Sequence, residues 1–338
     1  MVVSIAGTTI LPFMIEPTDA AFRHYFWFMQ ERMRIFWNRY EDKPRPWTSD
    51  EDLQTYKFTN VYRACDRVSQ YLIRRVIYVP ERTHFSALDV LLRILVFKVF
   101  NKVDTWEYLE YQLGEPLTTR NYDPARLTRW LTELQGVQAI FNSAYIMTGS
   151  HRDYTDYRTK HERWLHMIQA EMLDNERLQY IADAPSLRAI CQQLKACPFI
   201  GDFLACQYTI DFNYSEVVDF DENTFIAAGI GAIRGIKKCF RYDSRYSYED
   251  YIRHTQEHLE HYQNKYGYTE FRNLFGRAPH LIDFQNVFCE TDKLLRVKMP
   301  KFNLGQKRIK RKFKPGRPTP DYFFPPKWGL NRATNRPT

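Results

Sequence analysis

Several patterns that mark common protein classes are absent from this sequence. Its six cysteines form no C-x-x-C pair, which argues against a zinc knuckle and against a disulfide framework. No long apolar run occurs, and residues 1–15 have no basic leader before their apolar stretch, so neither a membrane span nor a signal peptide is expected. These absences predict a protein of a reducing, cytoplasmic compartment.

Two motifs for binding nucleotides and metals are also missing. The sequence has no P-loop G-x-x-x-x-G-K-[ST] and no H-E-x-x-H, so neither triphosphate binding by a P-loop nor zinc-protease chemistry is expected. His254, His258 and His261 would share one helical face, but no acidic or cysteine partner stands beside them at metal-ligand spacing. The residues alone therefore predict no metal site.

Strand signals are few, since only residues 2–14 carry one, and helical periodicity dominates elsewhere. Apolar residues recur at every third or fourth position in 22–40, 61–76 and 88–99. With 338 residues and 44% hydrophobic content, the chain can bury a full core. The predicted fold class is all-α.

Local signals indicate where several helices begin and end. Thr18 or Asp19 is placed to cap the first long helix. Asp104 opens a capping-box variant, Gly114 is the matching stop, and Asp123 stands before a proline in the order favoured at a helix start. These ends agree with the apolar periodicity.

The chain divides into a helical body and a basic end. A Gly-Ser break at 149–150 predicts lobes of residues 1–150 and 151–300, and helical periodicity vanishes in the tail, 301–338. From Lys293 onward there are fourteen Lys or Arg residues and one acid, so the excess positive charge lies there. Such asymmetry indicates a polyanionic partner, and nucleic acid is preferred. We expect DNA contacts from Lys307, Arg308, Lys310, Arg311, Lys312 and Lys314.

The stretch 281–297 has unusual polar residues for a surface helix. Asp283, Asn286, Glu290 and Lys293 line up on one helical face, apart from an apolar stripe. This face predicts specific hydrogen bonding, to which the neighbouring Gln285 would add. The alternative is a charged surface helix stabilised by pairs along its own face.

Residues 186–212 outline a helix-hairpin-helix, in which a turn aims backbone N–H groups at a DNA phosphate. Only Gly201 of the usual two glycines is present, because Phe199 replaces the first. A plain helical hairpin is the alternative. Asp219 and Asp221 follow at about the distance at which glycosylases of this class place a catalytic aspartate, although either aspartate would also serve as a helix cap.

Blocks of residues spread over most of the chain together resemble one family. They are 45–48, 56–63, 66–72, 97–102, 200–207, 229–235, 281–296, 308–310 and 325–328. In combination they are similar to the helical domain named after 5-hydroxymethyluracil DNA kinases, also called the alpha-glutamyl/putrescinyl thymine pyrophosphorylase family. The resemblance implies a two-lobed, all-helical body distantly similar to helix-hairpin-helix DNA glycosylases. It also implies thymine hypermodification, chiefly in bacteriophages and hence in the host cytoplasm.

In the implied reaction, an amino acid or polyamine nitrogen attacks a pyrophosphorylated 5-hydroxymethyluracil in double-stranded DNA and expels pyrophosphate. Because the chain has no P-loop, we interpret it as the transferase rather than the kinase. The amine needs a carboxylate to take its proton, and the leaving group needs Lys, Arg or a divalent metal such as Mg²⁺. No cofactor is firmly expected, and the protein is expected to be a monomer.

Candidate residues for these roles come from the polar blocks. Asp283 and Glu290 are candidates for base and amine orientation, Gln285 and Asn286 for the base edge, and Lys293 with Arg234 for pyrophosphate. The second block would face the same pocket with Asn60, Arg63, Asp66, Arg67 and Gln70.

Two alternatives stay open. One is a glycosylase that excises a modified base with Asp219 or Asp221, and the other is a DNA-binding protein without catalysis. A helical body with a basic tail is compatible with all three functions.

Overall fold

The computed structural model describes residues 15–79, 85–143, 147–303, 309–314 and 321–334, and this part of the chain is helical. The predicted all-α class is confirmed, since pairing between extended segments is limited there to three isolated β-bridges. The strand signal at 2–14 lies outside the described residues. No helix in the described part is long and apolar enough to cross a membrane.

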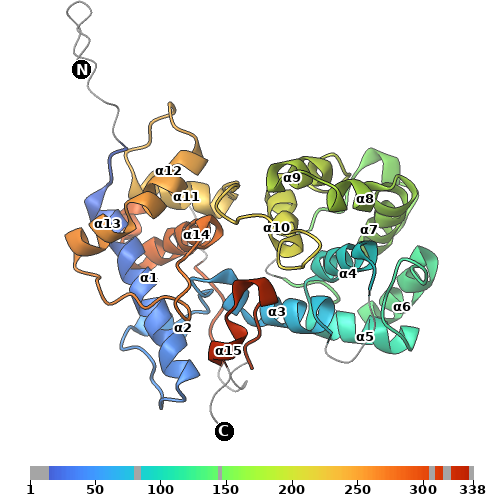
Figure 1. Ribbon diagram of the computed structural model, residues 1–338, viewed down its shortest axis with the longest axis horizontal. Helices are drawn as coiled ribbons and strands as arrows, with labels where there is room; N and C mark the ends of the chain where they lie inside the picture. The colour runs from blue at the N-terminus through green and yellow to red at the C-terminus, as the bar shows by residue number, and fades with distance from the viewer. Residues whose placement is uncertain (1–14, 80–84, 144–146, 304–308, 315–320, 335–338) are drawn as a thin grey trace, which may run out of the picture.

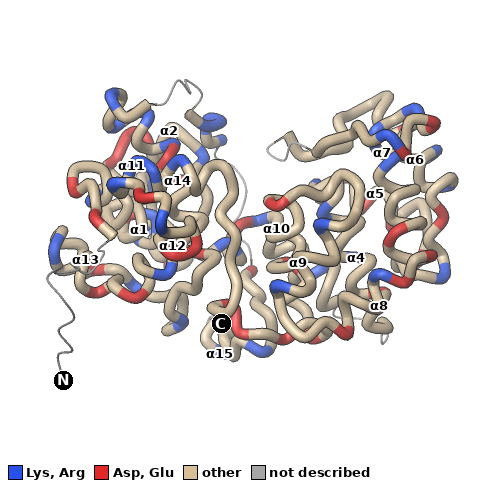
Figure 2. Tube along the Cα trace, turned by 90° about the horizontal axis from the view of Figure 1, so that it is seen from above, with Lys and Arg blue, Asp and Glu red and all other residues tan. Residues whose placement is uncertain are grey.

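One group of helices combines the two ends of the chain (Figures 1 and 2). Here α1 packs against α11, α13 and α14, and α12 packs against α14. The members of this group are α1 (Asp19–Tyr40), α2 (Glu51–Thr55), α11 (Ile230–Cys239), α12 (Tyr248–Glu257), α13 (Leu259–Tyr266) and α14 (Leu281–Lys298).

The middle of the chain forms the second group, which lies beside the first in both views (Figures 1 and 2). Its members are α4 (Ala87–Phe100), α5 (Val103–Leu113), α6 (Pro124–Val137), α7 (Lys160–Met167), α8 (Arg177–Ala182), α9 (Leu187–Lys195) and α10 (Asp202–Phe212). The grouping therefore does not follow the expected division at residue 150, because the apolar face of α1 packs on α11 and α14.

A short helical run connects the two groups. It consists of the 3₁₀ turn η1 (Arg63–Cys65), α3 (Arg67–Tyr71) and the π-helical stretch η2 (Leu72–Ile77). At one end η1 contacts α14, and at the other η2 packs on α4.

A buried cluster of charges attaches the connecting run to the second group. The Arg63 guanidinium donates to both carboxylate oxygens of Asp211 on α10, at 2.7 and 3.0 Å. Lys98 on α4 lies 3.2 Å from the same carboxylate, which is fully buried. Arg63 also donates to the hydroxyl of Tyr214 at 3.2 Å. Asp211 thus holds η1, α4 and α10 together.

Helices α11 and α14 approach unusually closely because α11 has glycines where they meet. A Cβ added at Gly235 would overlap the backbone carbonyl of Phe288, and one at Gly231 would overlap the thiol of Cys289. Gly231 and Gly235, which belong to the block 229–235, therefore serve the packing between these two helices.

We expect Gly235→Ala to lower the free energy of unfolding by about 1–3 kcal/mol, because a backbone atom cannot move aside as a flexible side chain can. Urea unfolding would measure the change. Gly136→Ala in α6 is the matched control, since nothing lies within 4 Å of its Cβ, and it should be neutral or stabilising. Equal effects of the two substitutions would contradict this account of the packing.

Candidate functional site

A cavity of about 930 Å³ lies between α1, the 45–58 segment, the start of α3 and the C-terminal residues 311–314 and 322. It is called the basic cavity below because of the side chains around it. A single carboxylate, that of Asp66, is found among the described residues that line it. Eight Lys or Arg residues contribute to the lining: Arg32, Arg39, Arg45, Lys57, Arg67, Arg311, Lys312 and Lys314.

Aromatic rings line the same cavity, contributed by Phe36, Trp47, Tyr56, Phe58, Phe313 and Tyr322. The Arg45 guanidinium lies 4.4 Å from the centroid of the Trp47 ring and 5.5 Å from that of Phe313. Arg45 therefore connects the 45–58 segment to the C-terminal wall by cation–π contacts. Rings beside cations are the combination on which nucleic-acid bases stack next to their phosphates.

Asp66 is held at the cavity wall by Asn60. The backbone N–H and the side-chain amide of Asn60 both donate to Oδ1 of Asp66, at 3.0 and 2.9 Å. No residue in the described part of the chain donates a hydrogen bond to Oδ2. Burial raises the pKa of Asp66, while the bonds from Asn60 and the positive charge of Arg32 lower it. A carboxylate with a raised pKa and a free oxygen is suited to accept a proton.

The predicted second polar block divides between two places. Asn60, Asp66 and Arg67 line the basic cavity. Arg63 instead binds Asp211, and Gln70 bonds the Ala64 carbonyl and the backbone N–H of Phe323. The sequence could not separate these residues, because both kinds lie close together between positions 60 and 70.

The predicted polar face of α14 points at the 59–63 segment. Asp283 accepts hydrogen bonds from the backbone N–H groups of His280, at 2.9 Å, and Arg63, at 3.3 Å. Burial raises the pKa of Asp283 to about 6. Asn286 donates to the carbonyl of Asn60 at 2.6 Å. Gln285 is buried on the same helix, 5% exposed.

Glu290, on the same face, is only 2% exposed and has three polar partners. Its carboxylate accepts from the backbone N–H of Thr59 at 2.9 Å and forms ion pairs with Lys293 and Lys310. Burial raises the pKa of Glu290, but the two lysines outweigh burial and hold it well below its ordinary value. Neither Glu290 nor Asp283 is among the residues that line the basic cavity.

Arg234 lies on α11, where its Nε is 3.3 Å from Asp292 of α14. Asp292 also pairs with Lys238 at 2.8 Å and with Arg296. Arg234 therefore belongs to an ion-pair cluster between α11 and α14. It is not among the residues that line the basic cavity.

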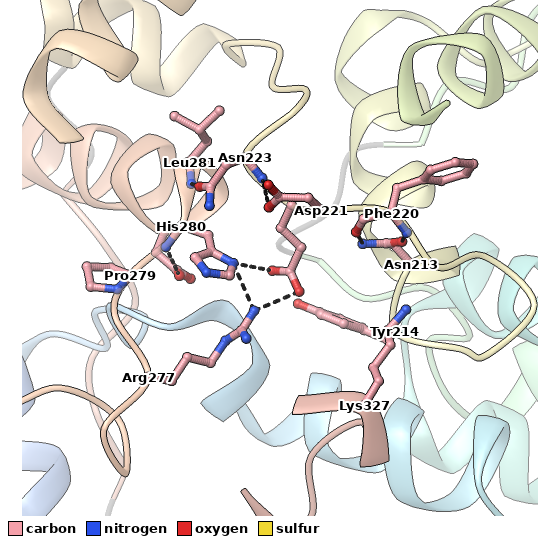
Figure 3. A network of polar contacts seen from close by, with 12 residues as sticks. Asn213, Tyr214, Phe220, Asp221, Asn223, Arg277, Pro279, His280, Leu281 and Lys327 are labelled. Atoms are coloured by element: carbon pink, nitrogen blue, oxygen red, sulfur yellow. Dashed lines mark hydrogen bonds and ion pairs between the residues drawn. The ribbon is translucent and has the colours of Figure 1, made fainter. Parts of the chain in front are cut away.

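Asp219 and Asp221 lie in the connection between α10 and α11. Figure 3 shows Asp221 on this connection, opposite His280 and Arg277. Asp219 is exposed and lies 3.2 Å from Lys327, and Oδ1 of Asp221 accepts from the backbone N–H of Asn223. Neither aspartate caps a helix, because the N-cap of α11 is Gly229.

Between these aspartates and α14 lies a denser network (Figure 3). Glu222 pairs with Arg277 at 2.9 Å, and the His280 ring lies 3.4 Å from the same carboxylate. The Arg277 guanidinium also stacks 3.9 Å from the centroid of Trp328. These contacts connect residues 213–223, called the interlobe connection below, to the start of α14 and to Trp328 near the C-terminus.

The hairpin predicted at 186–212 is present as α9 and α10, with the turn between them. Gly201 is the N-cap of α10, and its Cα has open space beside it. Phe199 adopts a left-handed conformation, with φ of 68°, at the position where the missing glycine was expected. Its ring packs against Trp164 and Tyr154. Phosphate binding by this hairpin stays a prediction.

The cations expected to bind DNA through the tail have different positions. Arg311, Lys312 and Lys314 line the basic cavity, whereas Lys310 pairs with Glu290. Lys307 and Arg308 lie outside the described residues. Sequence analysis missed Arg32 and Arg39 of α1, although their seven-residue spacing, with Phe36 between them, places cations beside an apolar stripe.

The described residues include no group of three or more His, Cys, Asp or Glu side chains that could hold a metal ion. The basic cavity does not fit a divalent cation either, because Mg²⁺ prefers carboxylate oxygens and the lining, as far as the structure describes it, has one carboxylate among eight cations.

Comparison with known proteins identifies the family of this chain. Residues 19–304 match the family described as the helical domain of 5-hmdU DNA kinase. The chain belongs to this family. The matched region runs from α1 beyond the end of α14, so it includes Asn60, Asp66 and Arg67 but ends before the 311–314 wall of the basic cavity.

A protein of Bacillus phage SP10 named 5-hmdU DNA kinase is 25% identical over 228 residues. The alignment covers 64% of this chain and 36% of the phage protein, so the chain spans little more than a third of that relative. No solved structure matches.

Proposed function

We propose that this protein modifies a thymine-type base in DNA by joining the nitrogen of an amino acid or polyamine to its 5-methylene carbon, with release of pyrophosphate. The name of the phage relative supports a substrate of the 5-hydroxymethyluracil type. The observation that carries the proposal is the composition of the basic cavity, in which eight cations and several aromatic rings surround one carboxylate.

Each part of the lining suits one requirement of the reaction. A pyrophosphate leaving group carries several negative charges, which Lys and Arg side chains stabilise as the bond breaks. A base that is displaced from the duplex stacks on aromatic rings and exposes its 5-substituent. A cavity of about 930 Å³ has the size of ordinary ligand sites.

Asp66 is the proposed general base. The attacking amine is an ammonium ion at neutral pH, so it must give up a proton before its nitrogen has a free electron pair. Oδ2 of Asp66 would take that proton while Asn60 holds Oδ1. The C–N bond then forms as the bond between the methylene carbon and the phosphate oxygen breaks. The electron pair of the broken bond leaves with pyrophosphate.

The other predicted catalytic residues receive positioning roles in this proposal. Asp283, Asn286 and Glu290 hold the 59–63 segment, and that segment holds Asp66 through Asn60. Lys293 supports Glu290, and Arg234 supports the packing of α11 on α14.

Analysis of nucleosides from treated DNA tests the function. DNA carrying 5-pyrophosphomethyl-deoxyuridine would be incubated with the protein and a mixture of amino acids and polyamines, then digested and analysed by mass spectrometry. We expect a heavier nucleoside that contains nitrogen, together with an equal amount of released pyrophosphate. Abasic sites without a new nucleoside would establish the glycosylase alternative. Unchanged DNA that the protein nevertheless binds in a gel-shift assay would favour binding without catalysis.

A further inference from the structure

The outer wall of the basic cavity comes from a distant part of the chain, residues 309–314. This segment runs antiparallel to residues 55–57, where Tyr56 and Lys312 form a β-bridge. The N–H of Lys57 donates to the carbonyl of Arg311, and that of Phe313 donates to the carbonyl of Thr55, both at 2.8 Å. The main chain thus presents Arg311, Lys312 and Lys314 to the cavity.

One buried carboxylate attaches this wall to the body. Glu290 on α14 pairs with Lys310, the residue directly before the wall cations, and also accepts from the N–H of Thr59. The Lys310 side chain is only 14% exposed, and its ammonium lies 5.6 Å from the centroid of the Phe58 ring. Glu290 therefore fixes both the 309–314 segment and the segment on which it docks.

The charges of the wall make this attachment necessary. Arg311, Lys312 and Lys314 share the cavity with five further cations. Like charges that line one cavity repel one another. Among the described residues of the lining, Asp66 is the one opposite charge. A multiply charged anion between the walls would turn this repulsion into attraction. The Glu290–Lys310 pair and the cation–π contact of Arg45 with Phe313 attach the wall to the body.

We propose that the Glu290–Lys310 ion pair is a latch that builds a diphosphate-binding site, with residues 309–314 as its outer wall. The ligand class is a diphosphate group, either free or as an ester. The inference rests on the proposed function in that the diphosphate is the leaving group of that reaction. Glu290 and Lys310 are positioning residues, because they act through the placement of Arg311, Lys312 and Lys314.

Calorimetric titration of the full chain with inorganic pyrophosphate tests the latch without DNA or amine. We expect one pyrophosphate per chain. Lys310→Met should weaken its affinity at least tenfold, although Lys310 itself does not line the cavity. The double substitution Arg311→Gln with Lys312→Gln should weaken it at least as much while keeping the main-chain bonds to 55–57. Lys301→Gln is the control for charge, since Lys301 is exposed outside the cavity, and should change the affinity less than twofold.

Circular dichroism on each variant separates loss of the latch from loss of the fold. If Lys310→Met unfolds the chain, the double substitution on the wall still decides the question. Absence of pyrophosphate binding by the unaltered protein would overturn the proposal. So would unchanged affinity in the folded variants, or an equal loss in Lys301→Gln.

The outcome is distinguishable from failure of the proposed function. Pyrophosphate binding that depends on the latch, in a protein that transfers no amine, would leave the site standing and remove the transferase. If the protein transfers an amine but its affinity for pyrophosphate is unchanged in Lys310→Met, the transferase function would stand and the latch would be removed. An orthophosphate titration completes the design. Binding as tight as that of pyrophosphate would contradict a site built for a diphosphate.

Discussion

Asp66→Asn is expected to lower the rate of amine transfer by about two to four orders of magnitude, the range ascribed to a positioned general base. Asparagine preserves the size of the side chain and can still accept hydrogen bonds from Asn60 through its oxygen. It cannot take a proton from the attacking ammonium. Single-turnover formation of the modified nucleoside, measured by mass spectrometry, would give the rate.

The matched control for this substitution is Asp221→Asn. Asp221 is an exposed aspartate that accepts one backbone hydrogen bond in the interlobe connection, so its loss should leave the rate nearly unchanged. Full activity of Asp66→Asn would remove Asp66 as the base. A large loss of the transfer rate in Asp221→Asn would favour catalysis at the interlobe connection, as the glycosylase alternative requires.

The second large effect is expected at the buried cluster between η1, α4 and α10, where Asp211→Asn should lower the free energy of unfolding by about 3–5 kcal/mol. The substitution leaves Arg63 and Lys98 buried without the carboxylate that both contact. Urea unfolding followed by circular dichroism would measure the change.

Asp219→Asn provides the comparison for Asp211→Asn. The pair of Asp219 with Lys327 is exposed on the carboxylate side, and such surface pairs contribute about 0–1 kcal/mol. If Asp211→Asn costs no more than Asp219→Asn, the buried cluster does not hold η1, α4 and α10 together.

Local sequence patterns predicted the helices well because they depend on neighbouring residues. Asp123 caps α6 with Pro124 at the first helical position, and Gly114 ends α5 with φ of 71°, both as predicted. The capping box expected at Asp104 was wrong, since α5 begins at Val103 and its N-cap is Lys102. A one-residue shift is enough to remove such a cap.

The assembly of the site depends on contacts between distant segments, which periodicity does not encode. The polar face of α14 was recognised as unusual, but its partners at 59–63 lie more than 200 residues away, and Lys310 lies 20 residues further along the chain than Glu290. The tail was interpreted as an arm for DNA from its charge. Charge alone could not reveal that residues 311–314 line a cavity with α1.

The most direct test of the central claim is to locate the base on the protein. A DNA duplex with 5-iododeoxyuridine in place of the modified thymine would be bound, irradiated, and mapped by peptide mass spectrometry. We expect cross-links to the rings that line the basic cavity, in peptides that contain Trp47, Tyr56 or Phe313. Cross-links confined to the interlobe connection at 213–223, with none at the basic cavity, would contradict the account.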